Sequence, residues 1–215
     1  MALEGTHVRF ALDLMPMLKI GNIGAYCAGA VYPDTRYVTC VDRNVTHGPE
    51  CPHDPFADGL SSFQRGWASH LLYDHDAGGA MKTFLSPELG PLGQGNSAWV
   101  EFTAMKVVED LEAIRNRPDV LTHLQTLSMP TSPSGEPLEK LQYHFSVTSK
   151  LYQTVPGLEG YRQWFIDIGA PEELASAFAD RARAMLGDVK YSANLTAIYQ
   201  RVLDAALVAQ RAETA

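Results

Sequence analysis

A histidine and an aspartate four residues apart, His70 and Asp74, form the pair in this sequence best spaced for metal chemistry. Residues four apart on a helix project from one face, so an imidazole and a carboxylate can meet there. Gly66 lies one turn earlier on the same stripe and leaves room for another group to approach. We expect Asp74 near the helix C-terminus, where a nearby cation would offset the unfavourable macrodipole. Because this spacing is common, the alternative stays open that His70 is an ordinary buried histidine and Asp74 an ordinary helix-end aspartate.

Three further residues supply the same types of ligand. His7 falls in an expected first helix, Asp34 follows Pro33 just past a helix end, and His47 lies in the same loop. Each is weak evidence alone, but imidazoles and carboxylates together suit Zn²⁺ or Fe²⁺. The sequence therefore predicts a metal site that draws on His7, Asp34, His47, His70 and Asp74.

The order of these motifs resembles that of the zinc-dependent phospholipase C-like family, whose relatives include single-strand nucleases on the same all-helical scaffold. The matching pieces are Thr-His at 6–7, Gly-Ala-x-x-Pro-Asp at 29–34, Arg-x-x-Thr-His at 43–47 and Gly-x-x-x-His-Leu-Leu-x-Asp at 66–74. The similarity covers roughly residues 1–110. No motif of the family is found in residues 111–215.

The resemblance implies a role for each matching residue. His47, His70 and Asp74 would hold a first metal, and His7 would join a second, with Asp74 able to bridge. Asp34 would be a ligand or the general base that prepares a water for attack.

A second ligand cluster of the family is poorly represented in this chain. Glu101 is the candidate remnant, with Ser97 where the family has a histidine. We therefore expect one or two zinc ions rather than three, and iron also suits these ligands. Lys106, on the same expected helix as Glu101, is expected at the surface.

The ligand set predicts a metal-dependent hydrolase that acts on a small phosphoester or a related ester or amide. A bound metal lowers the pKa of its water and polarises a phosphoryl oxygen. Asp34 is the candidate catalytic base, provided that it lies within hydrogen-bond reach of that water. Arg36 and Arg43 lie in the same loop and are candidates for binding an anionic group of the substrate. Two solvated loop arginines are an equally compatible interpretation.

Three other interpretations remain open. His75-Asp76 is a pair typical of HD-domain phosphohydrolases and of diiron oxygenases with that fold, but the Gly78-Gly79 that follows indicates a helix end there. That site would draw on His47, His75, Asp76 and His123 or His144. A structural zinc site is a further alternative, from Cys40, His47, Cys51 and His53. The last is a non-catalytic binding protein on the same scaffold.

The overall composition narrows the partners. With 25 acidic and 17 basic residues the formal charge is −8, which disfavours general binding of nucleic acids but leaves small anionic substrates compatible with a metal. No amphipathic helix with a basic face indicates a membrane surface. The absence of an export signal and the odd count of three cysteines favour a cytoplasmic protein with reduced thiols. We expect a small-molecule substrate.

The elements that must position these residues read as one all-α domain over 1–215. Strand signals are scarce, with 37–41 as one candidate for an extended piece, and 33–59 reads as a long functional loop. Whether the last helix packs on the core or on a second subunit of a homo-oligomer stays open. The expected helices are 5–14, 22–31, 61–75, 97–115, 138–152, 158–168, 171–185 and 192–212.

Overall fold

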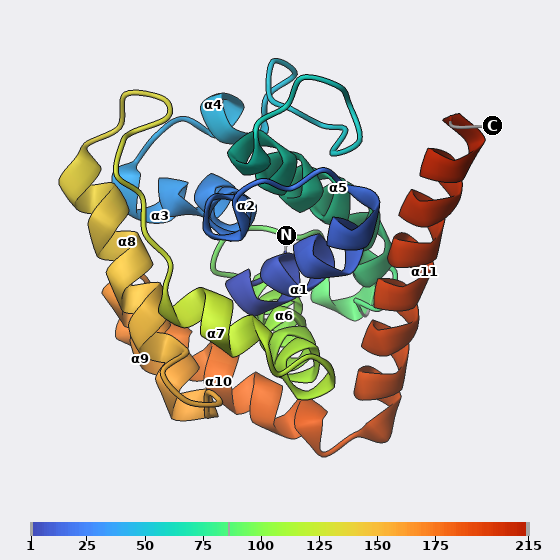
Figure 1. Ribbon diagram of the computed structural model, residues 1–215. Coiled ribbons are helices and arrows are strands. Elements are labelled where there is room, and N and C mark those ends of the chain that lie inside the picture. The colour runs from blue at the N-terminus through green and yellow to red at the C-terminus, as the bar shows by residue number, and fades with distance from the viewer. Residues whose placement is uncertain (1, 86, 214–215) are drawn as a thin grey trace.

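The computed structural model describes residues 2–85 and 87–213, in which helices joined by loops are the regular structure (Figure 1). Eleven α-helices and three short 3-10 turns are formed by these residues, with no strand among them, so the all-α prediction is confirmed. The helices are α1 (Glu4–Leu14), α2 (Ile23–Val31), α3 (Arg36–Thr39), α4 (Arg43–His47), α5 (Ser62–Lys82), α6 (Ser97–Asn116), α7 (Val120–Gln125), α8 (Leu138–Leu151), α9 (Leu158–Asp167), α10 (Glu172–Leu186) and α11 (Val189–Glu213). The 3-10 turns are η1 (Met15–Met17), η2 (Tyr32–Thr35) and η3 (Pro87–Leu89).

Two sequence-based expectations about secondary structure were wrong. α5 runs through Gly78 and Gly79 to Lys82, so Asp74 lies well inside the helix and not at its C-terminal end. The macrodipole argument for a cation beside Asp74 therefore fails, although the spacing argument does not depend on it. Residues 36–39 of the presumed loop form α3 rather than an extended piece, because no neighbouring strand offers them a ladder.

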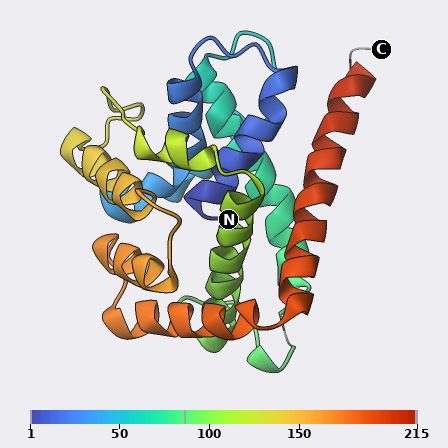
Figure 2. The same cartoon turned by 60° about the horizontal axis from the view of Figure 1, so that its bottom comes forward.

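α1 lies at the centre of the molecule, between α2, α5 and α6 (Figures 1 and 2). One core cluster joins α1 to α5, α6, α9, α10 and α11, and the other joins it to α2, α7 and α8. The C-terminal helix α11 packs along α5 and α6 and buries Leu195, Ile198 and Val202 against them. This helix therefore covers the core of its own chain.

α2 and α5 approach each other more closely than side chains would allow. A Cβ atom on Gly29 would lie 2.0 Å from the carbonyl oxygen of Phe63, and one on Gly66 would lie 1.9 Å from that of Tyr26. Both glycines are therefore required by the contact between the two backbones. This contact brings the second half of α2 against the first two turns of α5.

The N-terminus of α1 is held by a carboxylate from α6. Leu3, at the N-cap position, provides no side-chain hydrogen bond. Instead, Asp110 accepts a hydrogen bond of 2.8 Å from the backbone amide of Thr6, and its second oxygen accepts from the hydroxyls of Tyr152 and Tyr161 at 2.8 and 2.6 Å. The anion satisfies free amides at the positive end of the helix. Thr6 itself lies inside the helix.

None of the described helices is both long and apolar enough to span a membrane.

Candidate metal centre

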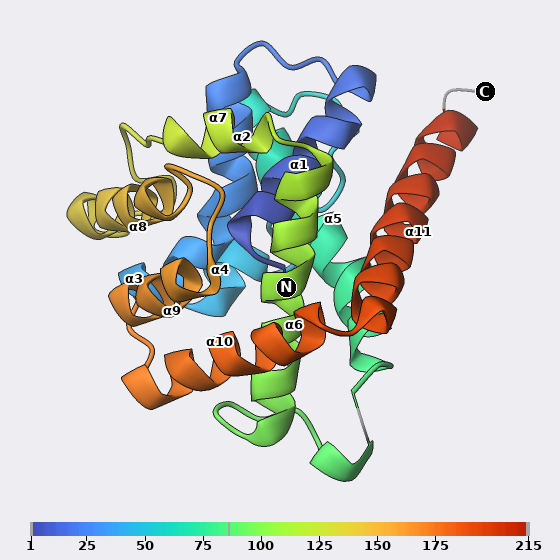
Figure 3. The same cartoon turned by 90° about the horizontal axis from the view of Figure 1, so that it is seen from below.

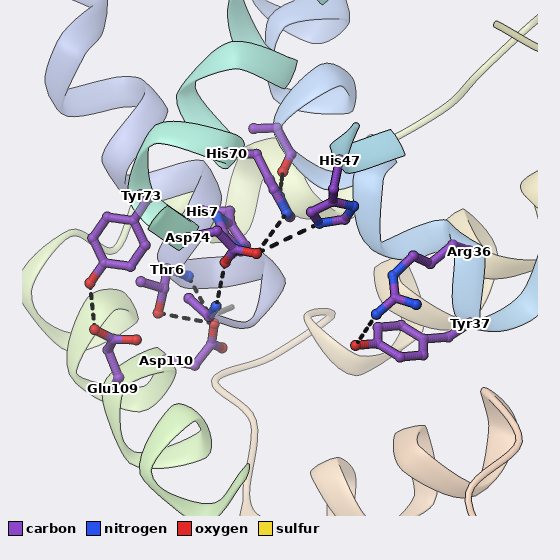
Figure 4. A network of polar contacts seen from close by, with 12 residues as sticks. Thr6, His7, Arg36, Tyr37, His47, His70, Tyr73, Asp74, Glu109 and Asp110 are labelled. Atoms are coloured by element: carbon purple, nitrogen blue, oxygen red, sulfur yellow. Dashed lines mark hydrogen bonds and ion pairs between the residues drawn. The ribbon is translucent and has the colours of Figure 1, made fainter. Parts of the chain in front are cut away.

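Three imidazoles converge on one carboxylate inside the helical core (Figure 4). His7 Nε2 lies 3.4 Å from Oδ1 of Asp74, and the Nε2 atoms of His47 and His70 each lie 3.6 Å from Oδ2. The side chains come from α1, α4 and α5, and each of them is at least nine-tenths buried. The structure therefore brings together four of the residues that the sequence singled out as ligands.

His70 is oriented by the close contact between α2 and α5. Its Nδ1 lies 2.8 Å from the carbonyl oxygen of Ala30, in the last turn of α2, where carbonyl groups lack partners within the helix. Because a carbonyl oxygen accepts, Nδ1 carries the proton and Nε2 presents its lone pair to the cluster. This arrangement is the one usually found when a carbonyl fixes the tautomer of a metal-bound histidine.

His47 is positioned at the end of the short helix α4. The Asp42 side chain caps that helix by accepting a hydrogen bond of 2.7 Å from the amide of Asn44. Trp67 of α5 donates its indole N–H to the carbonyl oxygen of Thr46 at 2.8 Å, which attaches α4 to α5. The Nδ1 atom of His47 pairs with the Thr46 hydroxyl at 2.8 Å, so Nε2 faces Asp74.

Burial keeps the three imidazoles neutral. Desolvation, followed by the charge of neighbouring His70, lowers the pKa of His7 well below its ordinary value and that of His47 to about 3. Desolvation likewise lowers the pKa of His70. Neutral imidazoles are the form that binds metals, because protonation would remove the donor lone pair.

Asp34 lies beside this cluster, in the turn η2. One ligand atom each from Asp34, His47 and His70 fall within 4.8 Å of one another, as do atoms from His7, His70 and Asp74. The two triads share His70, whose Nδ1 is already held by Ala30. All five expected ligands therefore lie in one region, as two overlapping triads that could hold a metal ion.

The donor atoms of the cluster fit a divalent ion. Both ring nitrogens of His7 and the Nε2 of His70 are buried and make no hydrogen bond with any described residue. A buried polar atom without a hydrogen bond costs roughly 1–3 kcal/mol, so three of them in one place need an explanation. Nitrogen and carboxylate donors in this number suit Zn²⁺ or Fe²⁺, and coordination would use one nitrogen of His7 and the Nε2 of His70.

A cleft of about 670 Å³ opens on the cluster. His47 and Asp74 form part of its wall, and Arg43 and Lys82 add two positive charges. In a chain of net charge −8, cations beside a cluster that could hold a metal favour an anionic ligand. Arg43, a candidate from the sequence for binding such a group, lies in the wall of this cleft, and Lys82 joins it from the part of α5 that was not expected to be helical.

Glu101 and Arg36 are engaged elsewhere. The carboxylate of Glu101 pairs with the guanidinium of Arg181 and accepts a hydrogen bond of 2.9 Å from the Tyr191 hydroxyl, so it is not part of either triad. Arg36 stacks over the ring of Tyr37 and donates to its hydroxyl at 2.8 Å. The geometry gives no support to a ligand role for Glu101.

The alternative sites are not assembled in the described residues. His75 is 88% exposed and pairs with its neighbour Asp76 on the surface of α5. His144, on α8, lies 3.3 Å from the buried Glu4. Neither the HD-like set nor the set with Cys40 and Cys51 occurs among the groups whose ligand atoms converge.

The sequence analysis missed Lys106 and Asp110. Lys106, expected at the surface, is only 6% exposed and faces a second pocket together with Asp34. One signal in the sequence could have indicated that they share a helix face: Trp99, Thr103, Lys106 and Asp110 follow one another at helical spacing. This row mixes apolar, polar and charged side chains, so it does not show which face is buried. The partners of Asp110 come from α1, from the end of α8 and from α9, and no local sequence pattern indicates them.

In comparisons with known proteins, no family model, curated protein or solved structure matches this chain. No family is identified. The candidate centre therefore depends on the convergence of its own side chains, and the resemblance to phospholipase C-like enzymes remains an interpretation of four short motifs.

Proposed function

We propose that this protein is a metal-dependent hydrolase of small phosphoesters or related esters. The observation that carries the proposal is the convergence of His7, His47 and His70 on the Asp74 carboxylate at the wall of a cationic cleft. The buried nitrogens of His7 and the Nε2 of His70, which make no hydrogen bond with a described residue, have no evident structural purpose, whereas a bound ion would use one nitrogen of each ring. This arrangement agrees with the resemblance to the zinc-dependent phospholipase C-like family.

The ligands divide between the two oxygens of Asp74. His47 and His70, which face Oδ2, would hold a first zinc ion together with that oxygen. His7, which faces Oδ1, would help to hold a second ion, and Asp74 would then contribute to both. When bound, such an ion polarises a phosphoryl oxygen and lowers the pKa of water towards neutrality.

The chain's own residues would supply the remaining functions. Arg43 and Lys82 would bind the anionic oxygens of the substrate in the cleft, where a guanidinium can form two parallel hydrogen bonds. Asp34, 9% exposed and beside His47 and His70, would accept the proton from the attacking water. Hydrolysis breaks the P–O bond, with hydroxyl added to phosphorus and the proton passed to the departing oxygen.

The proposal is tested with the full chain, purified without chelator. We expect at least one equivalent of zinc or iron by elemental analysis, and anaerobic turnover of bis(p-nitrophenyl) phosphate or p-nitrophenyl phosphate. Asp74→Asn and His70→Ala should lower kcat/KM by roughly a hundredfold or more, because each removes a ligand. The exposed His75 provides the matched control His75→Ala on the same helix.

Two results would overturn this function. A folded, metal-loaded protein that turns over neither substrate would be a binding protein. Turnover that requires dissolved oxygen and consumes it would make the protein an oxygenase. Circular dichroism of each variant separates loss of the ligand from loss of the fold.

A further inference from the structure

A second pocket, of about 260 Å³, shares no lining residue with the cleft and meets the cluster at Asp34. It lies where α9 and α10 pass beside α6 (Figure 3), and Asp34 belongs to its wall. Most of the other lining side chains are aromatic or aliphatic, among them Trp99, Trp164, Phe165 and Phe178. Such walls fit a flat apolar group and offer few partners to a polar one.

The charged end of this pocket is formed by Lys106 and Asp34. The Lys106 ammonium lies 5.1 and 5.7 Å from the ring centroids of Phe102 and Trp99, and no described residue forms a hydrogen bond or ion pair with it. Burial is the main reason that its pKa falls to about 8, and the nearby carboxylates of Asp34 and Glu109 oppose that fall. Contacts with aromatic faces compensate only part of the cost of burying a charge. The ammonium therefore has donors to spare at the end of the pocket nearest the cluster.

These features select among ligand classes. The positive charge of Lys106 would repel a cationic ligand. A sugar would place its hydroxyls against the rings of Trp164 and Phe165, where they find no hydrogen-bond partner. An aromatic group joined to an anionic head satisfies both ends, because the rings contact the apolar part and the ammonium donates to the head. The head would then lie beside Asp34, and hence beside His47 and His70.

We propose that this pocket binds the aromatic group of the substrate while the Lys106 ammonium holds an anionic oxygen of the phosphoryl group attached to it. The substrate class is an aromatic phosphoester. The inference rests on the proposed hydrolase for its catalytic meaning, since it names the substrate of that site. Binding to the pocket requires no turnover, so the two proposals can fail separately.

The binding test uses benzylphosphonate, which cannot be hydrolysed, with inorganic phosphate and benzyl alcohol as its two fragments. Binding to the full chain is followed by quenching of tryptophan fluorescence, because Trp99 and Trp164 line the pocket. Each titration is repeated with chelator, so that contacts with metal do not contribute. We expect benzylphosphonate to bind at least tenfold more tightly than either fragment.

Two variants locate the binding. Lys106→Met keeps the length of the side chain and should weaken benzylphosphonate at least tenfold while leaving benzyl alcohol unchanged. Lys190→Met, at an exposed position of α11, is the matched control. Ala170→Phe places a ring in the pocket and should weaken both ligands. If Lys106 served only as a counter-charge for buried acids, Lys106→Met would change the free energy of unfolding and leave the affinity for benzylphosphonate unchanged.

The outcomes decide the inference. Wild-type affinity in a folded Lys106→Met protein, or phosphate bound as tightly as benzylphosphonate, would overturn it. Should Lys106→Met fail to fold, unchanged affinity in Ala170→Phe would do the same.

Turnover separates this inference from the proposed hydrolase. Benzyl phosphate and methyl phosphate both release an alcohol, so they differ mainly in the ring. Equal kcat/KM for the two keeps the hydrolase and removes the pocket. Binding through Lys106 without any turnover keeps the pocket and removes the hydrolase.

Discussion

The imidazole rings of His7 and His70 stack face to face, with their centroids 3.6 Å apart and their planes 16° from parallel. They come from different helices, α1 and α5, and neither Nε2 makes a hydrogen bond with a described residue. Two imidazolium ions could not stack in this way within a buried site, because like charges at this distance repel strongly. The stack is therefore stable with both rings neutral, in the form that metals bind.

Removal of either stacked ring should weaken metal binding. We expect the affinity for zinc to fall by at least about tenfold in His7→Ala and in His70→Ala, because each substitution removes a candidate ligand. Competition with a coloured chelator measures the affinity. His75→Ala, which truncates an 88% exposed imidazole on α5, should bind zinc as the wild type does. Equal affinity in all three variants would show that the cluster does not hold the ion.

Bound metal should stabilise the fold. A ligand that binds only the native state adds about 2.7 kcal/mol when its concentration is a hundred times its dissociation constant. Addition of chelator should therefore lower the Tm by several degrees, and excess zinc should restore it. The same protocol applied to Asp74→Asn should leave the Tm nearly constant. A Tm that ignores chelator in the metal-loaded wild type would contradict a site inside the core.

The contact between α2 and α5 should tolerate no added methyl group. Gly29→Ala and Gly66→Ala would each drive a Cβ into a backbone carbonyl, so we expect a loss of roughly 2–4 kcal/mol in the free energy of unfolding. Gly79→Ala is the matched control on α5, where a Cβ meets nothing within 4 Å. It should stabilise the helix by about 0.5–1 kcal/mol. Urea unfolding of the three variants measures these differences, and a neutral Gly66→Ala would contradict the close approach.

Glu109 should make stability depend on pH. Burial raises the pKa of this carboxyl from 4.5 to about 7 in the folded protein. Between these values the folded state holds a proton that the unfolded state releases, so the stability contributed by Glu109 falls as pH rises from 4.5 to 7. Above pH 7 the full cost of ionising a buried carboxyl is present.

The neutral variant Glu109→Gln should remove this cost while still accepting the hydrogen bond from Tyr73. We expect it to exceed the wild type in free energy of unfolding by about 1–3 kcal/mol at pH 8 and to match it near pH 4.5. Glu139→Gln, at an exposed position of α8, should change little at either pH. Urea unfolding at the two pH values measures the difference, and a destabilised Glu109→Gln at pH 8 would refute the predicted sign.

The sequence predicted the helices and the ligands that local spacing can indicate. His70 and Asp74 were found because one helical turn separates them, and the expected start of this helix at residue 61 agrees with the N-cap at Ser61. The end of α5 was missed because a glycine pair usually stops a helix, whereas here packing against α6 and α11 carries the helix on to Lys82.

Residues with distant partners could not be predicted in this way. Glu101 was expected at the metal because the family motif places an acid there, but Arg181 binds it from eighty residues further along the chain. Asp110 anchors α1 through Thr6 from more than a hundred residues away. The polarity of Glu101 and Asp110 could be read from the sequence, but the charge or amide that satisfies each depends on how the helices pack.

The five clustered side chains lie between positions 7 and 74, whereas half of the residues that line the aromatic pocket come from α9, α10 and the segment that joins them. If the proposed function holds, much of the surface that contacts the substrate is encoded apart from the candidate ligands, with Asp34 common to both. Substitutions within α9 and α10 would then change which molecules are accepted and leave the candidate ligands in place. The architecture in this respect suits divergence, since new selectivity can arise without rebuilding the chemistry.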